Sequence, residues 1–366
     1  MSLAFLEHLR VALAPPSYLA LPFAGIDVST SGVKAIHLVE RPYGLVLASY
    51  AEERLEPGAF IEGEYAEPAV ISATIARASA RIGITVANAA LPESKSYLFE
   101  TKTPGVTRDE WRTLVEQQLD ELVPLPVAET AFDVIPVGYA QAGTRSLVGI
   151  GFARRIVDNA LAVFDAASID VGALEGETFA MARALLPAGD SSTALIIDVG
   201  KTTTKIAIVV SRIPRFTTTI GIGGHAFTLA IQKNFGVTEQ EARKVKVEHG
   251  IVPTPGNADY LAAMLSTAAA IKDEISRWLE YWQSHGAKSG GHEPVSHALL
   301  VGGNASVRGL PEYLESALGL PVATGDVFTN LASRDYWIPE LDHAESLAYA
   351  TAIGLALRDS APPSHA

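Results

Sequence analysis

Residues 23–36 read FAGIDVSTSGVKAI, and the same pattern returns at residues 194–209 as ALIIDVGKTTTKIAIV. In each stretch an apolar run leads to an aspartate, a turn of small and hydroxyl residues follows, and a second apolar run begins. This order predicts a β-hairpin whose turn is built from Gly, Ser and Thr. Two similar hairpins half a chain apart predict two related lobes.

The segments around the hairpins alternate between strand and helix patterns. Thr107 and Glu110, for example, have the spacing of a capping box and predict a helix start. Strands followed by helices within each half predict an α/β protein. We expect helices at residues 68–82, 107–122, 155–167, 177–186, 226–235, 239–249, 260–284, 310–318 and 346–357, and strands at residues 86–91, 131–137, 146–150, 215–221 and 297–301.

Composition excludes several classes of protein. The 366 residues contain 28 Lys and Arg against 41 Asp and Glu, and the net charge is −13. This acidic balance argues against a large nucleic-acid footprint, which needs clustered basic residues. There is no cysteine, so disulfides, thiolate catalysis and thiolate zinc sites are excluded. No apolar run approaches the roughly 18 residues that a spanning helix needs.

The first 21 residues form a segment of their own. Leu3, Leu6, Leu9 and Leu13 recur at helical spacing, and the pattern ends at Pro15. We expect a short helix that packs on the body of the protein. A contact with a membrane surface or with a membrane partner is the alternative, although a single arginine is little cationic charge for binding lipid.

The hairpin turns have the chemistry of a phosphate site. Backbone N–H groups and hydroxyls in such turns converge on one point. Asp27 and Asp198 stand at the turn entrances, where a carboxylate can hold Mg²⁺ through water. Lys34 adds a point charge on the returning strand. A third turn, VGGN at residues 301–304, is placed to accept a base and ribose. One such turn alone is an ordinary hairpin, so the ordered set of three carries the prediction.

The order of these motifs resembles the actin-like ATPase superfamily, and the details resemble the PilM family of type IV pilus assembly proteins. The resemblance covers residues 22–358. It rests on GIDVSTSGVK at residues 25–34, TRDE at 107–110, ELVPLP at 121–126, EARKVK at 241–246, EISRWL at 274–279, LVGGN at 300–304 and AIGLAL at 352–357.

The resemblance implies a two-lobed actin-like ATPase fold with an FtsA-like inserted subdomain in the first lobe. The implied division of the chain is an N-terminal helical segment at 1–21, a first-lobe core at 22–106 and 169–192, an inserted subdomain at 107–168, a second-lobe core at 193–237 and 296–358, a second-lobe subdomain at 238–295, and a tail at 359–366.

The resemblance also implies a site for ATP or ADP with Mg²⁺ between the lobes, with Asp27 and Asp198 near the metal. Glu177 is the candidate catalytic residue that would orient water. Ser29 and Lys201 depart from the family pattern and put hydrolysis in doubt, so at most a slow ATPase is expected. The implied nucleotide-binding residues are Asp27, Ser29, Thr30, Ser31, Lys34, Asp198, Gly200, Lys201, Thr202, Thr204, Gly223, Gly224, Lys246, Gly302, Gly303 and Asn304.

The implied function is that of a cytoplasmic adaptor at the inner face of the bacterial inner membrane. Such a protein binds the cytoplasmic tail of a PilN-like membrane protein, and pilus motor-side proteins are further candidate partners. We expect the tail between the first lobe and the insert. The alternatives are an actin-like ATPase or small-molecule kinase, an FtsA-like division or polymer protein, and the cytoplasmic part of a secretion platform.

Overall fold

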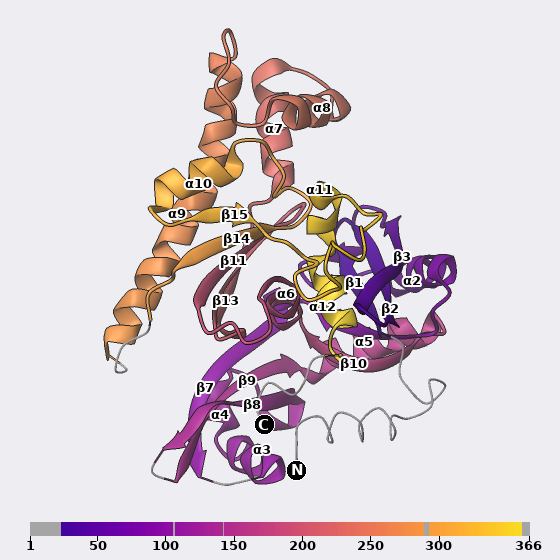
Figure 1. Ribbon diagram of the computed structural model, residues 1–366, viewed down its shortest axis with the longest axis vertical. Helices are drawn as coiled ribbons and strands as arrows, with labels where there is room; N and C mark the ends of the chain where they lie inside the picture. Colours follow the sequence, from indigo (N-terminus) through magenta and orange to yellow (C-terminus); the bar gives the residue numbers. More distant parts are fainter. Residues whose placement is uncertain (1–22, 105–106, 142, 289–292, 361–366) are drawn as a thin grey trace.

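The computed structural model describes residues 23–104, 107–141, 143–288 and 293–360. The expected helix at residues 1–21 and most of the expected tail at 359–366 therefore lie outside the described residues. The described chain forms two lobes and a smaller layer beside the first lobe (Figure 1). None of its helices combines the length and the apolar character that crossing a membrane requires.

The first hairpin is the centre of the first lobe's sheet. Strand β1 pairs antiparallel with β2, β2 with β3, and β1 pairs parallel with β6 on its other side. Helices α2 and α5 pack against this sheet and against each other. The sheet order is β10 (Asp170–Gly176), β6 (Val86–Leu91), β1 (Phe23–Ser29), β2 (Gly32–Arg41) and β3 (Gly44–Arg54), with α2 at Pro68–Ile82, α5 at Arg154–Ala166 and a small ribbon of β4 (Phe60–Ile61) and β5 (Glu64–Tyr65).

The second lobe repeats this topology. Strands β11, β12 and β13 are antiparallel, and β14 and β15 continue the sheet in parallel. The two predicted hairpins are thus equivalent parts of two equivalent sheets. The order is β13 (Ile213–Ile220), β12 (Thr204–Val210), β11 (Thr193–Val199), β14 (His297–Val301) and β15 (Val322–Thr324). The helices of this lobe are α7 (Gly224–Phe235), α8 (Glu239–His249), α9 (Ala258–Lys288) and α10 (Leu310–Leu318); α10 packs against β15 and α9, and α7 packs against α8 and α9.

Two helices join the lobes. Helices α6 (Glu177–Leu185) and α12 (Ala350–Ala356) pack against each other between the sheets (Figure 1). Their approach needs glycine, because a Cβ on Gly354 would stand 1.8 Å from the carbonyl oxygen of Ala180. Gly25 of β1 is equally close to α12, with 2.1 Å from its Cβ position to the oxygen of Ala352. These approaches hold α12 against α6 and against β1 of the first lobe through backbone contact.

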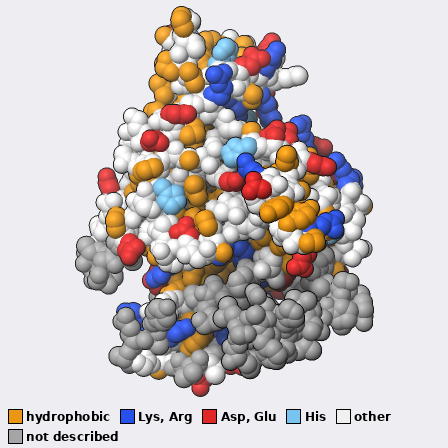
Figure 2. Space-filling model, in the orientation of Figure 1, with side chains coloured by type: hydrophobic (Ala, Val, Ile, Leu, Met, Phe, Trp, Pro, Cys, Tyr) orange, Lys and Arg blue, Asp and Glu red, His pale blue; other side chains and the backbone are white. Residues whose placement is uncertain are grey.

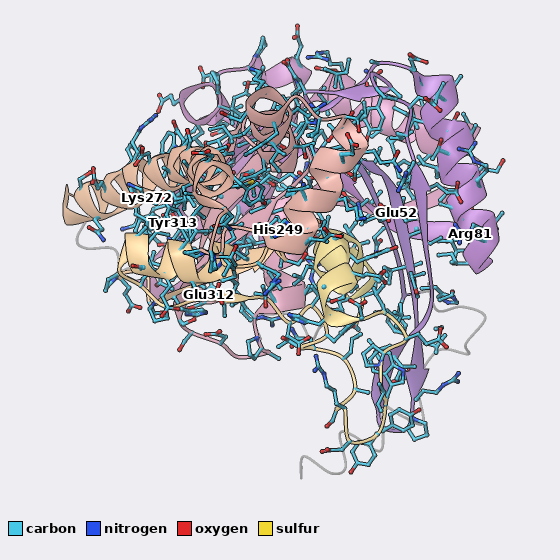
Figure 3. All side chains as sticks on the ribbon, turned by 90° about the horizontal axis from the view of Figure 1, so that it is seen from above. Glu52, Arg81, His249, Lys272, Glu312 and Tyr313 are labelled. Carbon is cyan, nitrogen blue, oxygen red and sulfur yellow. The ribbon has the colours of Figure 1, made fainter. Side chains whose placement is uncertain are left out.

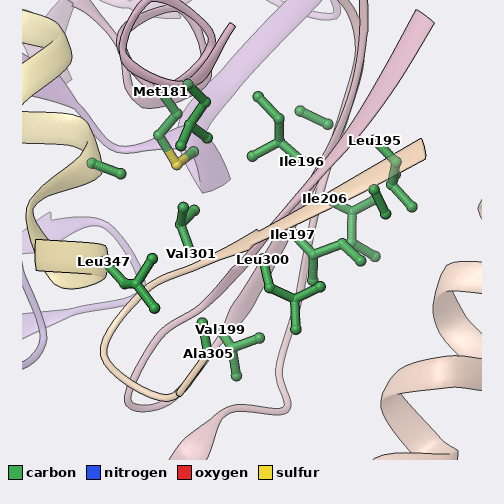
Figure 4. Packing of buried hydrophobic residues seen from close by; sticks show 14 of the residues in the cluster. Met181, Leu195, Ile196, Ile197, Val199, Ile206, Leu300, Val301, Ala305 and Leu347 are labelled. Atoms are coloured by element: carbon green, nitrogen blue, oxygen red, sulfur yellow. The ribbon is translucent and has the colours of Figure 1, made fainter. Parts of the chain in front are cut away.

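One apolar core runs through the second lobe and these helices. Figure 4 shows Ile197 of β11 beside Leu300 of β14, with Leu347 on the side where Val301 lies, and Ile197, Leu300 and Leu347 are almost fully buried. The expected single helix at 346–357 is wrong, since the chain forms α11 (His343–Ser346), the 3₁₀ turn η4 (Leu347–Tyr349) and then α12. The extra turn directs the side chains of Leu347 and Tyr349 into the core.

The smaller layer is a three-stranded antiparallel sheet with its own core. Its order is β7 (Ser96–Pro104), β9 (Thr144–Ala153) and β8 (Thr130–Gln141), preceded by the 3₁₀ turns η2 (Glu93–Lys95) and η3 (Val127–Glu129). The expected helix at 107–122 is wrong as one element. It divides into α3 (Arg108–Glu116) and α4 (Leu119–Leu122), because Gln118 leaves helical geometry at φ −115° and ψ 6°. The break buries both Val115 and Leu119.

The strand pairing suggests limits for the inserted subdomain. Strand β7 pairs with β9 along its whole length, although the sequence placed residues 96–104 in the first-lobe core. Helix α5 packs on α2 and β10, which belong to the first lobe. We propose that the insert spans about residues 96–153, in place of residues 107–168.

Candidate functional site

The two hairpin turns lie opposite each other, one from each lobe. The hydroxyls of Thr30 and Thr202 share a hydrogen bond of 3.1 Å across the gap. In the first turn, Lys34 donates from Nζ to Ser31 Oγ at 3.1 Å, and Ser31 Oγ also lies 3.0 Å from Ser29 Oγ. The predicted residues of both turns therefore converge on one place, with hydroxyl groups and an ammonium group facing it.

Each hairpin aligns its aspartate with a lysine on the returning strand. Asp27 stands opposite Lys34 in the strand register, and Asp198 stands opposite Lys205. Lys205 donates from Nζ to Asp198 Oδ2 at 3.0 Å and to Glu177 Oε1 at 2.9 Å. Sequence reasoning missed Lys205. The equal seven-residue spacing from aspartate to lysine in the two hairpins is the signal that would have found it.

Asp27, Asp198, Glu177 and Lys205 form a cluster of charged side chains whose burial and mutual interactions shift several of their pKa values. Burial raises the pKa of Glu177 to about 7, although attraction to Lys205 opposes the rise. Burial also raises the pKa of Asp27, against the attraction of Lys205 and Lys34. For Lys205, burial favours the neutral amine, but Asp198, Glu177 and Asp27 outweigh it and raise its pKa well above the usual range. The ammonium group of Lys205 is thus held charged among three carboxyl groups.

Both carboxylate oxygens of Glu177 are engaged. Oε1 accepts from Lys205, and Oε2 accepts from the backbone N–H of Glu93 at 2.8 Å. Glu93 in turn accepts hydrogen bonds at its Oε2 from the backbone N–H and hydroxyl of Thr178, both at 3.1 Å. This exchange fixes the start of α6 against η2, at the base of the insert. Nothing in the local sequence around Glu93 indicated the contact.

Asp27 differs from its neighbours. It is only 6% exposed, and its Oδ1 is buried with no hydrogen-bond partner among the described residues. A buried carboxylate oxygen without a donor is costly. Its free oxygen is therefore suited to a cation or to the water of a hydrated cation. No group of three or more metal-ligating side chains is gathered within the described ranges, so direct coordination by the protein alone is not the arrangement found.

Hydrogen bonds and close backbone approaches hold the glycine turns of the second lobe together. Asn304 donates from Nδ2 to the oxygen of Gly200 at 2.9 Å, and Lys246 donates from Nζ to Asn304 Oδ1 at 2.8 Å and to the oxygen of Gly224 at 3.2 Å. A Cβ on Gly224 would lie 1.9 Å from Asn304 Oδ1, and one on Gly302 would lie 2.3 Å from Asp198 Oδ1. Gly302 also has φ +93°. These positions accept only glycine without rearrangement.

The remaining predicted residues have different surroundings. A Cβ on Gly223 would meet the backbone of Thr202 at 2.7 Å, so Gly223 belongs to the same close contact. Thr204 is fully buried and donates to the oxygen of Ile222 at 2.7 Å, which holds the turn closed. The charge of Lys201 helps to lower the pKa of Glu239, after the larger effects of Arg243.

A cavity of about 580 Å³ extends the site between the lobes. The first lobe contributes Glu52 and Arg81, which Figure 3 shows on β3 and α2, and the second contributes Gly303, Ser306 and Glu345. A Cβ on Gly303 would have no neighbour closer than 3.9 Å, so this turn borders open space. Lys34 Nζ lies 3.8 Å from Glu52 Oε1, which connects the cavity to the first turn. Charged side chains of both signs are interspersed over the face drawn in Figure 2.

The buried position of Lys246 predicts a pH dependence. Burial, assisted by repulsion from Arg243, lowers the pKa of Lys246 from 10.5 to about 8. Between these values the unfolded chain binds a proton that the folded protein has lost, so stability rises with pH in this window. We expect the stability advantage of the wild type over Lys246→Met to grow from about pH 8 to 10.5 in urea titrations. A difference that stays constant across this window would contradict the assignment.

Comparisons with known proteins cover nearly the whole chain. The family model described as type IV pilus assembly protein PilM matches residues 25–360. A solved PilM-PilN type IV pilus biogenesis complex contains a chain with 21% identity and a TM-score of 0.76, covering 93% of this chain and 98% of that one. MreB5 of Spiroplasma citri, solved with bound ADP, has 14% identity and a TM-score of 0.53, covering 93% and 96%.

A curated relative matches over a shorter stretch. The cell division protein FtsA of Neisseria meningitidis serogroup B is 28% identical over 146 residues, which is 36% of this chain and 35% of that protein. The match thus spans about a third of the relative's length. Solved structures with sequence identities this low support the fold alone. They confirm the predicted two-lobed actin-like ATPase architecture.

Proposed function

Since the chain belongs to the type IV pilus assembly protein PilM family, we propose that it is an adaptor of the pilus inner-membrane platform that binds ATP or ADP between its lobes. The observation that carries the nucleotide part is the meeting of the two hairpin turns, with Thr30 and Thr202 3.1 Å apart and Lys34 beside them. Calorimetry with ATP in the presence of Mg²⁺ tests it, and an absence of binding would contradict it.

The residues present fit a nucleotide with its metal. In this proposal, the hydroxyls of Thr30, Ser31 and Thr202 and the ammonium of Lys34 hold the phosphates. The unpaired Oδ1 of Asp27 is the natural partner for hydrated Mg²⁺, which would neutralise phosphate charge. The cavity bordered by Gly303 would receive the base and ribose, near Lys246.

We propose that hydrolysis is slow. A residue that orients the attacking water must reach that water, and Glu177 is only 4% exposed and is held in place by hydrogen bonds from Lys205 and from the backbone N–H of Glu93. This supports an adaptor over the alternative of a kinase or fast ATPase on the same fold. Turnover of ATP with and without candidate sugars separates them, and a kcat in the usual range of about 1–10³ s⁻¹ would favour the enzyme.

The proposed partner is the cytoplasmic tail of a PilN-like inner-membrane protein, which would place the adaptor at the inner face of that membrane. A cavity of about 530 Å³ lies in the proposed insert, beside Arg154 at the start of α5 of the first lobe. Val127, Ala131 and Phe132 line it, with Arg112 and Arg154 beside them. The neighbouring β8 is an edge strand of its sheet. An extended peptide can add hydrogen bonds to such an edge and place side chains in the cavity.

A peptide-binding experiment tests this partner. We expect a labelled peptide of the neighbouring membrane protein's tail to bind, and Ala131→Glu to weaken it at least about tenfold by filling and charging the cavity. Ala80→Glu is the matched control, because Ala80 is exposed on α2. Failure of the wild type to bind the tail, or equal binding by Ala131→Glu, would contradict the proposed site.

The curated FtsA match favours one further candidate, an FtsA-like division or polymer protein. Polymer formation would appear as ATP-dependent sedimentation of the purified protein. The family model covers residues 25–360, far more of the chain than the 146 residues aligned with FtsA, and we therefore prefer the pilus assignment.

A further inference from the structure

Lys205 occupies an unusual position between the lobes. Its side chain, only 16% exposed, comes from β12 and reaches Asp198 of β11 at 3.0 Å and Glu177 of α6 at 2.9 Å. It is also attracted to Asp27 of β1, in the first lobe. One ammonium group thus faces carboxylates from three elements and both lobes.

The cluster has more carboxylates than a structural ion pair requires. Lys205 bonds to Asp198 and Glu177, and Lys34 stands opposite Asp27 in the strand register, where its charge acts on Asp27. Two ammonium groups thus accompany the three carboxyl groups. Asp27 Oδ1 has no donor. Carboxylates that converge in this way would repel a phosphate chain unless a cation stood among them. In a site of this chemistry a divalent ion commonly supplies that charge.

We propose that Lys205 is the built-in cation of this site, so that ATP or ADP binds with little dependence on Mg²⁺. The inference rests on the proposed nucleotide function and refines its metal requirement. Lys205 offsets part of the negative charge of Asp198 and Glu177 before any ligand arrives, and it therefore lowers the repulsion between these carboxylates and incoming phosphates. Mg²⁺ then has only the Asp27 side of the cluster to neutralise. Lys205 acts through these carboxylates and is a positioning residue.

The test compares ADP affinity in Mg²⁺ and in EDTA. For the wild type we expect a difference below about threefold, since the loss of one charged contact would give about tenfold or more. Lys205→Met should lose at least about tenfold in EDTA and regain most of it in Mg²⁺. Lys205→Arg, which keeps the charge, should behave like the wild type. Lys233→Met is the matched control, because Lys233 is exposed on α7.

A second readout needs no nucleotide. Removal of the ammonium group leaves Asp198 and Glu177 without the cation that bonds to both, beside the unpartnered Oδ1 of Asp27, and a hydrated divalent ion should then take its place through its water molecules. We expect Mg²⁺ to raise the Tm of Lys205→Met while leaving that of the wild type and Lys233→Met unchanged, since an ion that binds only the folded state stabilises it. A merely structural lysine would lower the Tm of the variant without making it respond to Mg²⁺.

The results distinguish a failure of the role proposed for Lys205 from a failure of the proposed nucleotide binding. A wild type that loses more than about tenfold in ADP affinity on removal of Mg²⁺ overturns the role of Lys205, as does a Lys205→Met variant with wild-type affinity in EDTA. A wild type that binds no nucleotide in either buffer contradicts the proposed function, and the melting experiment still decides the role of Lys205. If Lys205→Met does not fold, the wild-type comparison and Lys205→Arg decide it.

Discussion

Replacement of Lys34 by methionine should weaken ATP binding by about 10- to 100-fold, which corresponds to the loss of one charge-assisted contact. Lys34 is 5% exposed, and its ammonium group is held beside Ser31 in the turn that faces the second lobe. Methionine keeps most of the volume and removes the charge. The phosphates would then meet Asp27 and Glu52 with one cation fewer. Calorimetry at constant ionic strength measures the change.

The matched control for this prediction is Lys233→Met, which makes the same replacement on the exposed part of α7. It should bind ATP like the wild type. Circular dichroism and a melting curve establish that Lys34→Met is folded before its affinity is compared. An affinity within about twofold of the wild type would show that the first hairpin does not hold the phosphates.

Gly354→Ala should destabilise the protein by at least about 3 kcal/mol, at the upper end of the cost of overpacking. The added methyl group would stand 1.8 Å from the carbonyl oxygen of Ala180, and backbone atoms of α6 cannot move aside as a flexible side chain can. Helices α6 and α12 would have to separate. Because both helices touch both lobes, the loss should appear as one lower unfolding midpoint in urea.

Gly221→Ala provides the control, because nothing lies within 4 Å of the Cβ position of Gly221 and its backbone suits any residue. Its midpoint should stay close to that of the wild type. If Gly354→Ala unfolds at the same urea concentration as Gly221→Ala, then the tight contact between the two helices is not what joins the lobes.

Local patterns in the sequence predicted most of the second-lobe elements well. The helix at 239–249 and the strand at 297–301 have the predicted bounds, since a capping box of Thr238 and Glu241 and a short apolar run mark them clearly. Pairing between strands that lie far apart in the sequence could not be predicted from such local patterns. Strand β7 pairs with β9, about 50 residues further on, and no local pattern in residues 96–104 indicates that partner.

The residues of the site that belong to the repeated hairpin pattern could be predicted from the sequence. The hairpin pattern identified Asp27, Lys34 and Asp198, and the structure brings these side chains together. Lys205 was present in the quoted repeat but was not assigned. The role of Glu93 could not be predicted from the sequence. Its contacts with Glu177 and Thr178 join residues 84 and 85 positions apart and depend on how α6 packs against η2.

The position of α12 has a consequence for the order in which the protein can be made. Asn88 of β6 donates to the oxygen of Leu355, 267 residues further along the chain, and Gly25 of β1 is covered by Ala352. A ribosome releases the strands of the first lobe long before it releases the helix that covers them. The first lobe therefore lacks these contacts until α12 has been synthesised, and contacts of such long range are slow to form. Nascent chains stalled before residue 350 should accordingly be more sensitive to proteases and more dependent on chaperones than the released protein.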